Sequence, residues 1–281
     1  MRARGFVLVN ALVIAAAIAL IAVALLMRTQ TAQSGRGYDQ TRWQLERYMD
    51  GVEALVIGRL ARDLTGSVAD HDRESWARDT GGAEIDRGKV TVAVRDAQGL
   101  FNLNWIAGDD TGRAAEEFRR AARSNGLPPS VAETVIAHLN TVGALSMVEA
   151  LGPLSGIPQT HLATLGGFAA AIPGDRALNM NTSDETVLSA LLPSMNAALF
   201  LLIERNRPFE STTDFRDLLL DNMDAEDFDA VPFERLGVSS RWFELEISAE
   251  LDGKAARRRT LLERIPSPGV TKVAYRLRLP G

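Results

Sequence analysis

The chain begins MRARGFVLVNALVIAAAIALIAVALLMR, residues 1–28, and this stretch decides how the rest of the molecule is held. Two arginines precede an uncharged apolar run from Phe6 to Met27, which Arg28 closes. At about 1.5 Å of rise per residue, a helix over this run is about 33 Å long, roughly the thickness of a bilayer's hydrocarbon layer. The run therefore predicts a single-pass membrane helix over residues 6–28, with the N-terminus held in the cytoplasm by the leading arginines.

Composition excludes several classes of protein. The 281 residues include no cysteine and carry a formal net charge of −5. Neither a disulfide framework nor a thiolate metal site can form without cysteine. Nucleic-acid-binding proteins normally present a basic face, so the acidic balance argues against that class. His71, His138 and His161 lack HExxH spacing, and we expect no histidine metal centre.

A second helix is predicted beyond the apolar run. Apolar residues recur there at spacings of three or four, which places them on one helical face. These residues are Leu45, Met49, Val52, Val56 and Leu60. The pattern predicts an amphipathic continuation of the first helix over residues 29–64, with one face free to pack on another element.

In two distant parts of the chain, residues of one face alternate with residues of the other face, as they do in β-strands. Valines at 90, 92 and 94 alternate with Thr91 and Ala93 before a turn around Gly99. Near the C-terminus, residues 243–251 alternate apolar with polar, and Asp252-Gly253 is a strong hairpin signal. A return strand over 255–265 and a last strand over 272–279 follow. The last strand is expected to place four apolar residues on one face, Val273, Tyr275, Leu277 and Leu279.

The chain between these strands has helical periodicity. Short helices are predicted at 114–123, 129–139, 146–151, 159–165, 182–192 and 194–205. Two starts resemble capping boxes, Ser130 with Glu133 and Thr182 with Glu185. The first strand alone would leave an unpaired edge, so we expect the helices to be inserted into one antiparallel sheet. The predicted fold class is α+β, with the N-terminal helix packed on a small antiparallel sheet and a large all-helical domain between strands.

No set of residues converges on a catalytic site. Ser155 in Gly152–Gly156 stands one place too late for a G-x-S-x-G elbow, and no base accompanies it. The chain is therefore predicted not to be an enzyme.

An acid-rich stretch over residues 210–234 could offer oxygen ligands to a hard cation. EF-hand spacing is absent, because Met223 and Ala225 stand where acids should follow Asp221, and a solvated acidic face is the favoured interpretation. The weak metal candidates are Asp214, Asp217, Asp221, Asp224 and Asp227.

Residues 182–209 resemble a helix-hairpin-helix unit, which supplies an alternative function. A DNA-binding unit of that type presents backbone N–H groups of a glycine-containing hairpin to phosphate. The segment Pro193-Ser194-Met195 has no glycine, and its surroundings are acidic. A membrane-anchored periplasmic DNA-binding or other binding protein is thus the alternative rather than the prediction.

The start of the chain also carries a family resemblance. Arg4-Gly5-Phe6 before the apolar run resembles the cleavage site of type IV prepilins and type II secretion pseudopilins. The resemblance implies a leader over residues 1–5, removed by prepilin peptidase between Gly5 and Phe6, and N-methylation of Phe6. A secretory signal would have a shorter apolar stretch, of roughly 7 to 15 residues. A plain signal anchor remains open, although it gives no role to Gly5.

One position narrows the resemblance. Most pilins have glutamate as the fifth residue of the mature chain, where its carboxylate pairs with a neighbour's N-terminal amine. Here that position is Asn10, and an amide cannot neutralise the amine. The departure resembles the minor pseudopilin K family of type II secretion, whose members sit at the tip of the pseudopilus. Asn10 as a tolerated polar residue is the other interpretation.

Further motifs of that family occur in order along the chain. They are Asp70 to Ala77, Phe101 to Asn104, Ser146 to Glu149, Leu154 to Ile157, Leu178 to Thr182, Arg205 to Phe209 and Ser240 to Phe243. The family is the pseudopilin with a large helical insert, which implies a sheet domain split over 65–110 and 239–281 around an insert at 111–238. Some members bind calcium in that insert. Residues 135–146 lack the acids of the family's W-x-D-x-D stretch, so calcium is in doubt here.

The resemblance also implies where the protein works and with what. It implies a place in the bacterial inner membrane, with the C-terminal part in the periplasm. The implied partners are the minor pseudopilins I and J, the major pseudopilin and prepilin peptidase, and no nucleic acid. The implied function is to cap the tip of the periplasmic pseudopilus during protein export across the outer membrane.

Overall fold

The computed structural model describes residues 40–63, 69–78, 81–174, 176–192, 194–267 and 269–279. The predicted membrane helix over 6–28 lies outside these residues, and so do Gly5, Phe6 and Asn10. Within them the chain combines an antiparallel sheet with many helices, which confirms the predicted mixture of α and β structure.

Five strands form the main sheet in the order β1-β2-β7-β8-β9, with every neighbouring pair antiparallel. They are β1 (Gly81–Ile85), β2 (Gly88–Asp96), β7 (Trp242–Leu251), β8 (Lys254–Ile265) and β9 (Val270–Leu279). The alternation of residues 243–251 is confirmed, because Phe243, Leu245, Ile247, Ala249 and Leu251 are all buried. β2 pairs with β7 although a long stretch of chain separates them.

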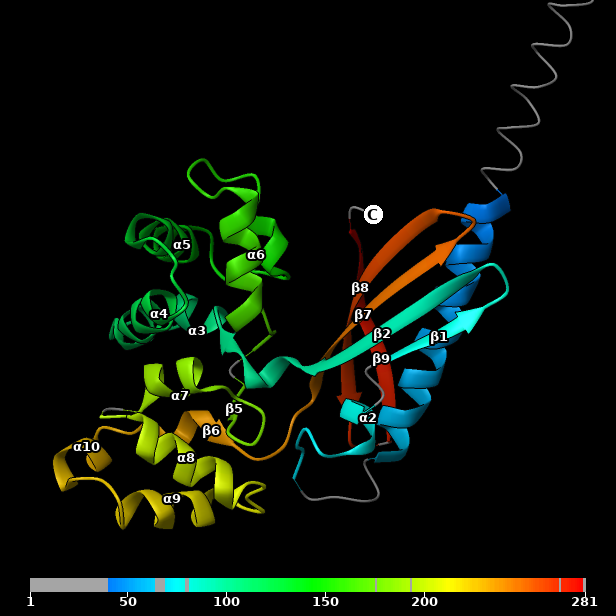
Figure 1. The fold of residues 1–281 in the computed structure, drawn as a ribbon. Coiled ribbons are helices and arrows are strands. Elements are labelled where there is room, and N and C mark those ends of the chain that lie inside the picture. Colours follow the sequence, from blue (N-terminus) through cyan, green and yellow to red (C-terminus); the bar gives the residue numbers. More distant parts are fainter. Residues whose placement is uncertain are drawn as a thin grey trace, which may run out of the picture.

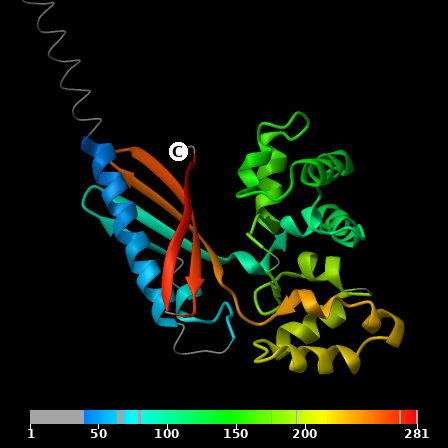
Figure 2. The same cartoon turned by 180° about the vertical axis from the view of Figure 1, so that it is seen from behind.

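One long helix covers one face of this sheet (Figures 1 and 2). We call it the spine helix, and its described part covers residues 40–63. The predicted stripe is confirmed, since Leu45, Met49, Val56 and Leu60 are buried against the sheet and Val52 packs partly buried beside them. Burial of such a stripe supplies about 1.5 to 3 kcal/mol for each large side chain.

The hairpin between β7 and β8 is as predicted, with positive φ values of 51° at Asp252 and 72° at Gly253. The last strand differs from the prediction. A register shift at Leu261/Leu262 changes the facing of its residues, so Val273 packs with the spine-side core while Tyr275 packs on the opposite face. A bulge reverses the side-chain alternation beyond it.

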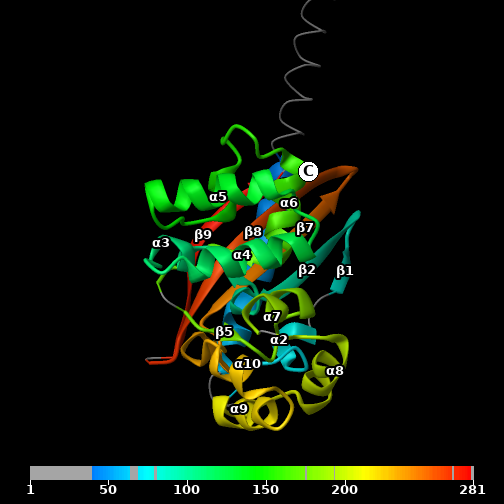
Figure 3. The ribbon, with the colours of Figure 1, turned by 90° about the vertical axis from the view of Figure 1, so that its left-hand side faces the viewer.

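Between β2 and β7 the chain is mainly helical, and we call residues 101–238 the helical segment. Its α-helices are α3 (Asn104–Ala107), α4 (Arg113–Ser124), α5 (Pro129–Val142), α6 (Gln159–Phe168), α7 (Glu185–Leu191), α8 (Ala197–Asn206), α9 (Thr212–Leu220) and α10 (Ala225–Asp229). Figure 3 shows these helices lying in front of the sheet, on the side away from the spine helix.

Shorter elements complete the fold. They are the helix α2 (Ser75–Arg78), the 3-10 turns η1 (Ala97–Gly99), η2 (Val148–Leu151) and η3 (Phe233–Arg235), and the short strands β3 (Phe101–Asn102), β4 (Ala169–Ala170), β5 (Leu178–Asn179) and β6 (Leu236–Gly237). The two short pairs, β3 with β4 and β5 with β6, are parallel. The helix predicted at 146–151 is only a 3-10 turn, η2.

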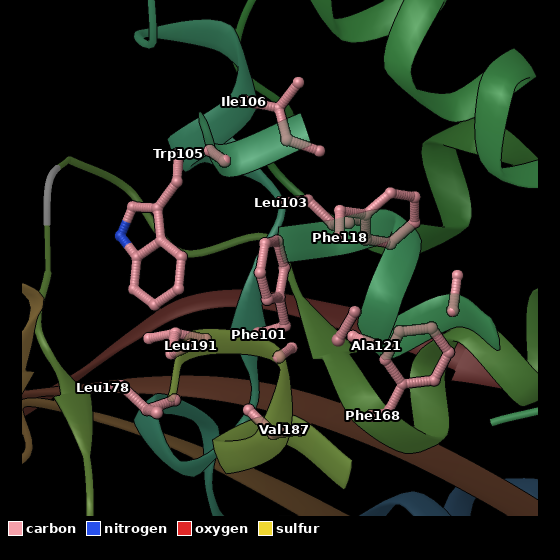
Figure 4. Close-up of a cluster of buried hydrophobic side chains, with 14 of the residues drawn as sticks. Phe101, Leu103, Trp105, Ile106, Phe118, Ala121, Phe168, Leu178, Val187 and Leu191 are labelled. Carbon is pink, nitrogen blue, oxygen red and sulfur yellow. The ribbon is translucent and has the colours of Figure 1, made fainter. Parts of the chain in front are cut away.

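The helical segment has a hydrophobic core of its own (Figure 4). Phe101 contacts Trp105 and Phe118 at ring-centroid distances of 5.1 and 5.6 Å, and Phe118 stacks on Phe168 at 6.2 Å. Asn102 and Asn104 form a corner beside it. The Asn104 carboxamide bridges Leu145 and Ile172, and Asn102 Oδ1 accepts from the amides of Asn104 and Ile172.

Both predicted capping boxes are wrong. Helix α5 starts at Pro129, as predicted, with Pro128 as N-cap, so Ser130 lies inside the helix and does not cap it. Helix α7 is capped by Asp184, because Thr182 is engaged elsewhere. The capping box that does form joins Ser211 and Asp214 at the start of α9.

Candidate functional site at the junction of sheet and helices

The five weak metal candidates are spread over two helices and their ends. Asp214 closes the capping box, Asp217 lies within α9, Asp221 caps its C-terminus, Asp224 precedes α10, and Asp227 accepts from the Ser194 hydroxyl. The five aspartates do not form a group of three converging carboxylates in the described chain. Four of them act as helix caps or hydrogen-bond acceptors and Asp217 is exposed, so their geometry lends no support to a calcium site.

One convergent acidic group occurs among the described residues, at positions that the sequence pattern alone does not connect. Asp63, Asp70 and Glu74 bring carboxylate oxygens within 4.8 Å of one another. The guanidinium of Arg264 lies among them, with Nη2 at 2.5 Å from both Asp70 oxygens and Nη1 at 3.1 Å from Asp63. Glu74 accepts from the indole N–H of Trp76 at 2.9 Å. Because an arginine already supplies the positive charge, the group is an ion-pair centre.

Asp96 is the neighbouring buried carboxyl group, at the end of β2. Its Oδ2 accepts from the hydroxyls of Ser240 and Thr182, each at 2.6 Å, and from Asn179 Nδ2 at 2.9 Å. Its Oδ1 accepts from the amide of Gln98 at 2.8 Å. The Ser240 amide in turn donates to Asp70 at 2.6 Å, so one network joins the sheet, the helical segment and the acidic group.

Burial raises the pKa values of three carboxyl groups here. It raises the pKa of Asp96 to about 6, although hydrogen bonds from Ser240 and Thr182 act in the opposite direction. It also raises the pKa values of Asp70 and Asp63, although their contacts with Arg264 act in the opposite direction. Carboxyl groups removed from water hold their protons more tightly.

A groove of about 860 Å³ separates the sheet from helix α6. Arg95, Arg257 and Arg259 line it together with three glutamates, Glu149, Glu244 and Glu246. These charges pair with one another; Arg95 contacts Glu244 at 2.8 Å, and Arg259 contacts Glu149 at 2.5 Å. Arg95 also donates to the carbonyl of Gly166 in α6. The groove is therefore held by paired charges that link sheet and helices.

The outer face of the spine helix carries exposed apolar side chains. Trp43 and Leu55 have exposed fractions of 68% and 74%, and Arg47 lies 6.0 Å from the centre of the Trp43 ring. The two residues lie about 18 Å apart along the helix and about 120° apart around it, so they are separate exposed apolar residues and not one patch. None of the described helices has both the length and the apolar character that a bilayer crossing requires.

The turn between α7 and α8, which the DNA-binding alternative requires, contains Ser194 at a positive φ of 55°. Its hydroxyl donates to Asp227 of α10. A carboxylate thus contacts the turn at which a phosphate would have to bind, and like charges would repel there.

Comparisons with known proteins find two similar proteins that share one name. It is 26% identical over 224 residues to the type II secretion system protein K of Pseudomonas aeruginosa, covering 66% of this chain and 67% of the relative. It is 32% identical over 150 residues to the protein of the same name from Klebsiella pneumoniae, covering 49% of this chain and 44% of the relative. No family model matches the chain.

The fold has a solved counterpart. The crystal structure of the GspK-GspI-GspJ complex from the type 2 secretion system of enterotoxigenic Escherichia coli contains a chain that superposes with a TM-score of 0.71 at 20% identity. The match covers 86% of this chain and 98% of that chain. The resemblance to the type II secretion protein K family that the sequence motifs suggested is thus confirmed.

Proposed function

We propose that this relative of type II secretion protein K is a minor pseudopilin that caps the tip of a periplasmic pseudopilus and supports protein export across the outer membrane. The order of elements supports the proposal most directly: a spine helix on a small sheet, with the helical segment between β2 and β7. The helical segment, with its own core, would be an inserted domain over about residues 111–238 between sheet parts at 65–110 and 239–281.

The proposed role is assembly rather than catalysis. Residues 6–28 would hold the chain in the inner membrane after removal of residues 1–5 by prepilin peptidase, with residues 29–64 continuing the helix into the periplasm. Asn10 lacks the carboxylate that would pair with a neighbour's N-terminal amine, so the subunit would end a filament and not extend it. The helical segment would make the end too wide for the filament shaft.

The partners proposed are the minor pseudopilins I and J, because the structural counterpart is a chain of the GspK-GspI-GspJ complex. Trp43 and Leu55, both exposed on the spine helix, are candidate contact residues. The major pseudopilin below the tip and calcium in the helical segment remain expectations of the family resemblance.

The N-terminus of the mature protein tests the proposal. Co-expression with prepilin peptidase should shorten the chain by residues 1–5 and add one methyl group to Phe6, as measured by intact mass. A Gly5→Leu variant should keep its full mass, whereas Gly35→Leu, outside the motif, should be processed normally. An unprocessed wild-type chain would count against the proposal, and salt-dependent retention on DNA would favour the binding-protein alternative.

A further inference from the structure

Helices α4 and α7 pack against each other within the helical segment (Figures 1 and 3). Asn125 caps the C-terminus of α4, and its backbone amide donates to the Ala121 carbonyl at 3.1 Å. Its side-chain Nδ2 donates to the same carbonyl at 2.9 Å and to Oγ1 of Thr186, in the first turn of α7, at 3.0 Å. Asn125 therefore joins the end of one helix to the start of the other, with both hydrogens of its carboxamide in use.

The link continues into the N-terminal cap of α7. The Thr186 hydroxyl donates its only proton to Asp184 Oδ1 at 2.8 Å, and the same oxygen accepts from the Val187 amide at 2.9 Å. Oγ1 of Thr186 thus acts as an acceptor toward Asn125 and as a donor toward Asp184. The side chain at position 125 therefore has to donate hydrogen bonds and not accept them.

Asn125 is followed by Gly126, and no other asparagine in the sequence precedes a glycine. Gly126 is exposed and has a φ of 71°. Since glycine has no side chain, its backbone nitrogen can approach the Asn125 side chain closely once the turn is free to move. In the closed turn the Gly126 amide donates to the Arg123 carbonyl at 3.0 Å, and the Leu127 amide donates to Ala122 at 2.8 Å. Such an approach therefore requires the end of α4 to open.

We propose that Asn125 is a site of spontaneous deamidation, which occurs when the end of α4 opens and gives a product that cannot rejoin α4 to α7. The Gly126 nitrogen loses its proton and forms a bond to Asn125 Cγ, while the bond from Cγ to Nδ2 breaks and Nδ2 leaves as ammonia. Water then opens the cyclic imide at either carbonyl, which leaves aspartate or isoaspartate at position 125. Nothing is oxidised or reduced. The site rests on the fold alone and does not depend on the proposed function.

The product no longer fits its surroundings. An ionised carboxylate has only acceptor oxygens, and one of them would face the Ala121 carbonyl oxygen. Thr186 could donate to the new carboxylate only by releasing Asp184. Isoaspartate also lengthens the backbone by a methylene group just before Leu127, which is buried. Deamidation therefore weakens the contact between α4 and α7, because polar groups that were paired lose their partners.

Incubation of the full-length chain in detergent at pH 7 measures the reaction. Liquid chromatography and mass spectrometry of digested samples separate the asparagine, aspartate and isoaspartate forms. A synthetic peptide of residues 119–131 in the same buffer gives the rate without the fold. The folded chain should convert at least about tenfold more slowly, because local opening exposes the site for only part of the time. Asn206 and Asn222, which are exposed and precede larger residues, should remain amides.

Thr186→Val removes one acceptor of Asn125 Nδ2 and keeps the shape of the side chain. Conversion in the folded chain should become about two- to tenfold faster, as the loss of one hydrogen bond allows. Thr164→Val is the matched control, because the Thr164 hydroxyl donates within α6 to the Thr160 carbonyl, and the rate should not change.

Three results would overturn the proposal. They are equal rates in the folded chain and the peptide, equal rates in Thr186→Val and Thr164→Val, and no product in either the wild-type chain or Thr186→Val after the peptide has reacted completely.

Asn125→Asp carries the aspartate product from the start and tests its effect. The amides of Leu127 and Val187 lie at the end of α4 and the start of α7. Their hydrogen exchange at pH 7 should be about tenfold faster than in the wild-type chain, whereas Ile247 in the sheet should exchange at the same rate in both.

Asn196→Asp is the matched control for this change. Asn196 caps the N-terminus of α8 by accepting from the amides of Ala198 and Leu199, and aspartate caps helices equally well. The control should therefore leave the exchange of Leu127 and Val187 unchanged. Equal exchange of these two amides in Asn125→Asp and Asn196→Asp would show that the product fits its place, and the proposal would fail.

Discussion

Glu53 shows how one residue of the spine helix fixes the helix on the sheet. It occupies the buried face of that helix, with an exposed fraction of 3%. Arg276 contacts it at 2.6 Å, Thr260 donates to it at 2.8 Å, and Arg258 lies at 3.5 Å. Burial alone would raise the pKa of Glu53, but these partners outweigh burial and hold the pKa below 4.5.

We expect Glu53→Gln to lower the free energy of unfolding by about 2 to 4 kcal/mol, because the buried ion pair with Arg276 is lost and Nη2 of the buried Arg258 loses its carboxylate partner, although Asp50 still pairs with Nη1. Chemical denaturation at pH 7 measures the loss. Glu250→Gln in β7 is the control and should cost under about 1 kcal/mol, since its partner Lys89 has a side-chain exposure of 58%. A similar loss in both variants would contradict the special role of Glu53.

The same residue gives a pH dependence of defined sign. A lowered pKa means that Glu53 contributes stability above its unfolded pKa, near 4.5, and that this contribution is lost as the pH falls through the folded value. The difference between wild type and Glu53→Gln should therefore shrink below that pH.

Single residues also show which contacts could not be predicted from the sequence. Glu53 lies four positions after Met49 and three before Val56, so its place on the buried face could have been noticed. Its arginine partners could not, since they lie more than two hundred positions away. The contact of Asp96 with Ser240 spans 144 positions. The motifs around Asp70, Asn179 and Ser240 could be recognised, but not that their side chains meet.

At the scale of elements, strands and helices could be predicted where their hydrophobic period or capping motif was clear in the sequence. β7 has a clean alternation because one face packs on the spine helix and the other faces the groove. β1 escaped prediction because Gly81 and Gly82 carry no side chains and the strand is exposed on almost every residue. Helix α9 escaped because its acids were interpreted only as surface charge, although Ser211 with Asp214 has capping-box spacing.

Two glycines allow an element-scale test. Gly88 begins β2, and a Cβ there would stand 1.9 Å from the Glu250 carbonyl oxygen of β7. Gly88→Ala must push the paired strands apart and should cost about 1 to 3 kcal/mol. Gly51→Ala, on the spine helix with open space around it, should instead stabilise the chain by about 0.5 to 1 kcal/mol. Thermal unfolding compares the two, and equal effects would refute the close approach of β2 and β7.

At the scale of the whole molecule, the sheet and the helical segment each have a core, and a smaller third cluster joins them, made of Ala97, Leu100, Ala170, Ile172, Trp242 and Leu261. The core between spine helix and sheet contains no residue from 101–238 among its buried members. Asp96 and Phe243 are register partners in the β2–β7 pair, so two residues could join them as a hairpin.

Replacing residues 97–242 by Asn-Gly should therefore leave a folded spine and sheet. Circular dichroism and slow amide exchange in β7 and β8 would measure this. Leu245→Asp in the shortened chain is the control and should abolish both signals, because Leu245 is fully buried. A shortened chain that is already unfolded would show that the helical segment is needed to hold the sheet together.

The pairing of β2 with β7 has a consequence for synthesis. Val90 meets Ala249 only after more than one hundred and fifty further residues have been made. Until then the edge of β2 that pairs with β7 has unpaired backbone hydrogen-bonding groups. The local contacts of the intervening helices can already form during that time. We expect the nascent chain to mature from its middle outward and to depend on holdase chaperones during that delay.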